Sequence, residues 1–131
     1  MATVKGILVN DGGAPARIIN FKAGETITAG MVLKCSSANV GQVLKATESG
    51  AMPAGIALTD AASGDQVSMI TGGGIICYVL AKAAVGLGTL CMVDENGTAG
   101  YVDVRGVDSD SDFCVTLEDI TADGLCKVLV F

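Results

Sequence analysis

Apolar positions along the chain alternate with polar ones or gather in short runs, and they almost never recur at the 3.6-residue spacing of a helix. A period of two is typical of half-buried β-strands. The one helix candidate, Ala81–Val85, is too short to stand alone. The pattern predicts short strands at Thr3–Val9, Arg17–Phe21, Met31–Lys34, Gln42–Ala46, Gly55–Thr59, Gln66–Thr71, Ile75–Ala81, Thr89–Val93, Tyr101–Val104, Phe113–Leu117 and Leu125–Phe131.

Turn signals separate these segments, and 18 glycines against two prolines favour many tight turns. The clearest hairpin is at Glu95-Asn96-Gly97, because Asn-Gly accepts the positive φ values of a type I′ turn. Many short strands at intervals of about ten residues indicate a compact all-β barrel or sandwich.

One strand-turn-strand plan occurs twice. Residues 58–65 have an echo at residues 117–124, and residues 27–33 resemble residues 85–91 at an offset of 58. At 131 residues the chain fits one domain. We therefore expect a single β-domain over residues 21–131 with two internal halves, at about 21–74 and 81–131.

Residues 1–20 fall outside this repeat and form an expected N-terminal arm, with apolar residues ahead of a glycine-rich hinge. Such an arm is either an ordinary edge strand or a segment that adds to a partner's sheet through its backbone donors and acceptors. The residues that would make the contact are Thr3, Val4, Ile7, Leu8 and Val9.

Composition and charge exclude two classes of partner. The longest run without a charge, Gln66–Ala81, contains three consecutive glycines and falls short of the about 20 residues of a spanning helix. We therefore expect no membrane segment, and the N-terminus shows no signal peptide. The net charge is −6, and residues 94–131 carry nine acidic groups against two basic ones. Nucleic acid is thus a poor partner, and this acidic third is expected to face water.

The residues needed for catalysis or for metal binding are missing from the pattern. The chain has no histidine, which removes the usual nucleophile–base pairs and imidazole ligands. Gly72-Gly73-Gly74 lacks the lysine of a phosphate-binding loop, so a turn is expected there. Residues 108–112 imitate a calcium loop, but Phe113 stands where that loop needs glycine. We expect a protein that is not an enzyme and has no cofactor or metal.

Five cysteines leave two possibilities open. They show no CxxC spacing, and all lie in apolar surroundings. They are either buried free thiols or, because their number is odd, include an inter-subunit disulfide. The candidates are Cys35, Cys77, Cys91, Cys114 and Cys126.

Three segments carry a resemblance to a known family: Lys22–Leu33, Pro53–Asp65 and Val67–Gly73, with Gly55-Ile56-Ala57-Leu58-Thr59-Asp60 at their centre. The chain resembles the head decoration, or capsid cement, proteins of tailed bacteriophages, from about residue 17 to its end. The likeness consists of common residues in a shared order.

The resemblance implies a β-clip or β-tulip-like fold, a homotrimer, and a place on the outer surface of the viral head after synthesis in the host cytoplasm. It implies a structural virion protein whose N-terminal arm pairs with the major capsid protein, and which stabilises the head by bridging neighbouring subunits of that protein. A virion is extracellular, so inter-subunit disulfides become chemically possible. The alternative is a non-catalytic binding module, a carrier or ligand-binding β-domain, on another virion part such as the tail or neck.

Overall fold

The structure is a computed structural model that describes residues 16–47, 53–82, 84–93, 99–104, 112–120 and 124–131. The predicted strand Thr3–Val9 and the hairpin turn at residues 95–97 lie outside these residues. The all-β prediction is confirmed, because every element in the described part of the chain is a strand. They are β1 (Arg17–Ala23), β2 (Val32–Cys35), β3 (Gln42–Lys45), β4 (Gly55–Ala57), β5 (Gln66–Thr71), β6 (Ile76–Ala81), β7 (Leu90–Val93), β8 (Val102–Val104), β9 (Cys114–Thr116) and β10 (Gly124–Val130).

Each of these strands overlaps a segment that the sequence pattern predicts. Gln66–Thr71 agrees at both ends, and the others differ by one or two residues at an end. The helix considered at Ala81–Val85 does not occur at its described residues. Ala81 ends β6, and Val85 forms an isolated antiparallel bridge with Ile120.

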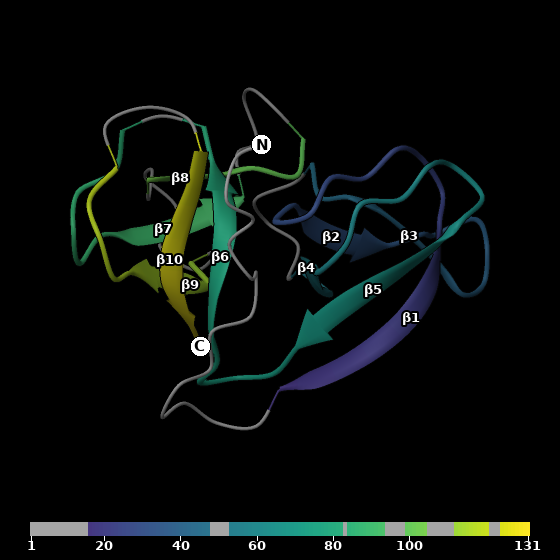
Figure 1. Cartoon of the computed structure of the whole chain (residues 1–131), viewed down its shortest axis with the longest axis horizontal. Coiled ribbons are helices and arrows are strands. Elements are labelled where there is room, and N and C mark those ends of the chain that lie inside the picture. The colour runs from purple at the N-terminus through teal and green to yellow at the C-terminus, as the bar shows by residue number, and fades with distance from the viewer. Residues whose placement is uncertain (1–15, 48–52, 83, 94–98, 105–111, 121–123) are drawn as a thin grey trace, which may run out of the picture.

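The ten strands close into two small barrels that lie side by side (Figure 1). The first barrel has the order β1-β3-β2-β4-β5, and the second has the order β10-β6-β8-β7-β9. In the first barrel β1 pairs antiparallel with β5 and parallel with β3, and in the second barrel β6 pairs antiparallel with β10 and parallel with β8. The remaining pairs of both barrels are antiparallel. The chain therefore uses one closed-barrel topology twice.

The strand register repeats together with the topology. Leu33 faces Gly55 in the first barrel, and Cys91 faces Cys114 in the second. Lys22 faces Gln66 in the first barrel, and Leu80 faces Leu125 in the second. The first member of each pair is displaced by 58 residues and the second by 59, which matches the offset of the sequence echo. Equivalent positions in the two barrels can thus be compared one by one.

Side chains that alternate along the strands fill the barrel interiors, and backbone hydrogen bonds and side-chain packing join the two barrels. In β6 every second side chain, from Cys77 to Ala81, is fully buried. The barrels are also joined by backbone hydrogen bonds, from Leu80 N–H to Gly30 O (2.9 Å), from Val32 N–H to Gly100 O (2.7 Å) and from Gly100 N–H to Ala46 O (2.8 Å). One core cluster includes residues of both barrels. These contacts fix the barrels to each other.

A glycine turn links β5 of the first barrel to β6 of the second (Figure 1). Gly74 has a φ of 79°, a left-handed conformation that favours glycine. Its N–H donates to Val130 O at 2.6 Å, which ties the link to β10. At the other end of the first barrel, the boundary expected at residue 20 falls inside β1, since that strand begins at Arg17.

Candidate attachment surface

The first half of β1 is a strand edge that no described strand covers. β5 pairs with β1 along its length, from Arg17 to Lys22, whereas β3 pairs with it only at Lys22 and Ala23. Residues 17–20 are all exposed, and the exposed fractions of Ile18 and Ile19 are 55% and 39%. An open edge presents backbone N–H and C=O groups to which another extended chain can add. This edge also offers apolar side chains on both faces of the strand.

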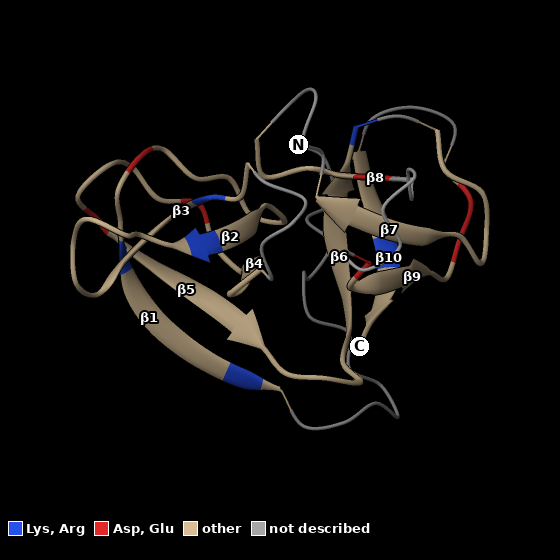
Figure 2. Ribbon diagram, turned by 180° about the vertical axis from the view of Figure 1, so that it is seen from behind, with Lys and Arg blue, Asp and Glu red and all other residues tan. Residues whose placement is uncertain are grey.

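Charge along this edge has one sign. Figure 2 shows no acidic residue in β1, while red acidic segments lie on the outer turns of both barrels. The described acidic residues of the second barrel include Glu118 and Asp119 in the turn after β9, and Asp119 is used locally, because its Oδ1 accepts the Leu87 N–H at 2.6 Å. The edge of β1 is therefore basic and apolar, unlike the acidic turn after β9 of the second barrel.

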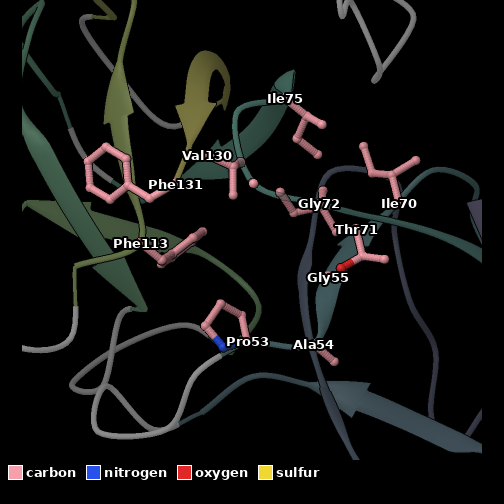
Figure 3. Close-up of a pocket in the computed structure, with 12 residues that line it drawn as sticks. Pro53, Ala54, Gly55, Ile70, Thr71, Gly72, Ile75, Phe113, Val130 and Phe131 are labelled. Carbon is pink, nitrogen blue, oxygen red and sulfur yellow. The ribbon is translucent and has the colours of Figure 1, made fainter. Parts of the chain in front are cut away.

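An apolar cleft of about 260 Å³ begins where this edge starts (Figure 3). Arg17 pairs with Thr71, and Thr71 lines the cleft together with the glycines that follow it. The walls come from both barrels, with Ile56 and Ile70 from the first and Phe113 from the second. Phe131 lies at the rim with 59% of its surface exposed.

The cleft is suited to apolar contact and not to acid–base chemistry. None of its described lining residues has a titratable side chain, and its volume of about 260 Å³ lies below the range of about 300–1,000 Å³ for small-molecule sites. Backbone hydrogen bonds hold its rim, since the Phe131 N–H donates to Phe113 O at 2.9 Å. A side chain from another protein is an occupant of suitable size.

The five cysteines that were candidates for an inter-subunit disulfide separate into two groups. Cys35, at the end of β2, is exposed, whereas Cys77, Cys91, Cys114 and Cys126 are buried in the second barrel. All five are free thiols in this structure, so no disulfide supports the inter-subunit bond considered from the odd count. The four buried sulfurs face the barrel interior and cannot reach another chain while the barrel is folded.

Burial dominates the ionisation of two of these thiols, Cys77 and Cys126. It raises the pKa of Cys77 to about 12 and, with help from the Glu118 carboxylate, that of Cys126 to about 11. A hydrogen bond to Cys91, reinforced by burial, holds the pKa of Cys114 well above its usual range. Cys77, Cys114 and Cys126 are therefore protonated near neutral pH and are poor nucleophiles in the folded barrel. The same hydrogen bond, from Cys114, lowers the pKa of the Cys91 thiol.

In the described part of the chain, no group of three or more histidine, cysteine, aspartate or glutamate side chains is placed to hold a metal ion. Among the same residues no helix has the length and apolar character needed to cross a membrane.

The predicted contact residues of the arm, Thr3, Val4, Ile7, Leu8 and Val9, lie outside the described residues, so their role stays a prediction. Residues 17–20 at the start of β1 fall within the arm expected at residues 1–20, but the predicted contact residues do not include them. A signal for this surface exists in Ile18-Ile19, where two adjacent apolar residues break the alternation of a half-buried strand.

Comparison with known proteins bears on the fold of the chain. No protein-family model matches the chain, and no curated protein matches it either. Among solved structures, the chain is similar to the head fiber gp8.5 N base of bacteriophage phi29, with a TM-score of 0.72 and 15% sequence identity. The match covers 89% of this chain and 95% of that one. At this identity the likeness shows the fold, which the two proteins share over nearly their whole lengths.

Proposed function

We propose that this chain is a structural protein of a bacteriophage virion that binds the outer surface of the head as a homotrimer. It stabilises the head by bridging neighbouring subunits of the major capsid protein, and it has no catalytic activity. Its place of action is the outside of the virion. Each copy adds interface that has to be broken before neighbouring capsid subunits separate, and an interface of about 800 Å² per partner suffices for stable binding.

The observation that carries this proposal is the near full-length likeness to the base of a phage head fiber. Fold alone does not fix function, so the proposal also draws on the surface. The open edge of β1 offers backbone pairing together with the exposed Ile18 and Ile19. The cleft beside it supplies an apolar pocket for an anchoring side chain. Attachment through an edge and a pocket suits a binding protein without catalytic groups.

Co-sedimentation tests the proposal. Particles of the virus that encodes the chain are stripped of it, separated into heads and tails, and mixed with the purified protein. We expect saturable binding to heads, an increased temperature of head disruption, and a trimer mass in light scattering. No binding to heads, or binding to tails alone, would overturn head attachment and favour the tail or neck module instead.

A matched pair of substitutions tests the role of β1. Ile18→Asp places a charge on the open edge of β1, whereas Leu87→Asp makes a matched change at an exposed position of the second barrel. We expect Ile18→Asp to weaken head binding about tenfold or more and Leu87→Asp to leave it unchanged. Equal binding by the two variants would exclude the β1 edge as the contact.

A further inference from the structure

Two of the buried cysteines stand directly opposite each other in the second barrel. Cys91 in β7 and Cys114 in β9 are Cα partners in an antiparallel pair, and neither has any exposed surface. Direct partners in such a pair have Cα atoms about 4.5–5.5 Å apart, with their side chains on the same face. A disulfide needs Cα atoms about 4.4–6.8 Å apart. The backbone therefore already has the spacing of a disulfide.

The two sulfurs also point toward each other. The Cys114 thiol is hydrogen-bonded to Cys91, and this bond is the largest influence on the ionisation of both groups. The other two thiols are placed differently: Cys77 faces Val128 and Cys126 faces Val79 across the β6–β10 pair. Of the four buried cysteines, Cys91 and Cys114 alone are direct cross-strand partners.

The first barrel shows that the fold does not require this thiol pair. At the equivalent positions it has Leu33 opposite Gly55. A side chain at Gly55 has no room, because a Cβ there would lie 2.5 Å from Ile70 O. The first barrel thus fills the site with one large residue and one glycine, whereas the second fills it with two residues that can be joined covalently.

We propose that Cys91 and Cys114 form an intrachain disulfide under oxidising conditions, which staples β7 to β9. With a small-molecule disulfide such as oxidised glutathione, the Cys91 thiolate attacks one glutathione sulfur and displaces the other glutathione as a thiolate. The Cys114 thiolate then attacks the Cys91 sulfur of the mixed disulfide and displaces the second glutathione. The two cysteines lose two electrons and two protons, and the two glutathiones gain them.

Access for the oxidant comes from folding or from local opening. β7 and β9 are joined at only two register pairs, Leu90–Val115 and Cys91–Cys114, and such short strand pairs open at lower free energy than the whole fold. Once formed, the bond constrains the unfolded chain over the segment that it closes, so we expect the melting temperature to rise by roughly 5–10 °C. The inference is independent of the proposed function, because it needs only an oxidising medium.

The experiment uses the full chain with Cys35→Ser, which removes the exposed thiol. The protein is unfolded and refolded in oxidised or in reduced glutathione, then digested without reductant and mapped by mass spectrometry. We expect a peptide linked through Cys91 and Cys114, and a higher melting temperature that dithiothreitol reverses. An oxidised protein that keeps four free thiols, or a link through Cys77 or Cys126, would overturn the proposal.

Single substitutions give an independent measurement. Cys91→Ala and Cys114→Ala should abolish the response of the melting temperature to oxidant, whereas Cys77→Ala and Cys126→Ala should retain it. Because each variant is compared with itself in the two media, any loss of packing cancels. An equal oxidative gain in Cys91→Ala and Cys77→Ala would contradict the assignment, and the peptide map of the parent protein decides the matter even if a variant does not fold.

Discussion

The two barrels share their strand pairing, but their outer faces differ in chemistry. In the second barrel, the half-buried Leu80 and Leu125 form a cross-strand pair that packs against Gly30 of the first barrel. In the first barrel, the equivalent pair is Lys22 and Gln66, and both are exposed. The same face therefore serves as a docking surface in one barrel and as a water-facing surface in the other.

This difference decides which barrel can dock onto another barrel through this face. A docking face and the surface that receives it are different, so barrels with identical apolar faces could add copies head to tail. Polar residues on that face prevent such docking and keep the surface soluble. Lys22 and Gln66 provide that polar face on the first barrel. The open edge of β1, where Ile18 is exposed, remains for another partner.

The strongest way to break this comparison is to give the second barrel the outer face of the first. Leu80→Lys with Leu125→Gln places a charge and an amide against Gly30, where two leucines now pack. We expect a loss of about 3–5 kcal/mol from the free energy of unfolding, measured by urea denaturation. We also expect the single transition to separate into two as the barrels lose their coupling.

The reverse exchange is the control. Lys22→Leu with Gln66→Leu makes the first barrel's face apolar at positions that are exposed. The free energy of unfolding should change little, while light scattering should show association that grows with protein concentration. The interpretation of the two faces would be wrong if the first double variant unfolded in one transition at unchanged stability.

Cross-strand volume gives the second prediction. Gly55→Ala places a methyl group 2.5 Å from Ile70 O and 2.7 Å from Met69 Cγ. Since the backbone oxygen cannot move cheaply, we expect a loss of about 2–3 kcal/mol in thermal or urea unfolding. Gly86→Ala is the matched control in the second barrel, because the nearest atom to its new methyl group is Thr89 Oγ1 at 3.7 Å, an ordinary contact. Comparable stabilities of the two variants would contradict the inference that the first barrel has no room for a side chain at residue 55.

The strands of this fold are largely readable from the sequence, because one buried face imposes a period of two. Gln66–Thr71 shows this, since its buried and exposed residues alternate over its first half and both of its ends agree with the prediction. The order in which strands close is not readable in this way. The pairing of Arg17 with Thr71 joins residues more than fifty positions apart, and no local pattern encodes it.

The surfaces were harder to predict than the strands. Along β6 the residues of both phases are apolar, so the sequence does not reveal that Leu80 faces the other barrel while Val79 faces the interior. The Cys91–Cys114 pair requires the register of β7 and β9 as well as the repeat. The edge of β1 is open because β3 pairs with it only from Lys22 onward, which follows from barrel closure and not from the residues of β1 themselves.

The smallest expected change in stability concerns one turn, which is closed by different hydrogen bonds in the two barrels. In the first barrel the Met31 N–H donates directly to Thr28 O at 3.1 Å, and Ala57 occupies the buried position beside the turn. In the second barrel that buried position is Thr116. Its hydroxyl accepts the Thr89 N–H at 2.8 Å and donates to Gly86 O at 2.7 Å. A buried hydroxyl thus stands between the two backbone groups that meet directly in the first barrel.

Thr116→Val keeps the volume of the side chain but removes the acceptor of the Thr89 N–H, so we expect a loss of about 2 kcal/mol from the free energy of unfolding. Thr116→Ala should cost only about 1 kcal/mol, because the smaller residue lets the turn close directly, as it does beside Ala57. Thr26→Val, at an exposed position, controls for the loss of a hydroxyl in general. Urea denaturation of the three variants gives the order. A larger loss for alanine than for valine would show that the hydroxyl fills space in the second barrel and does not replace a backbone hydrogen bond.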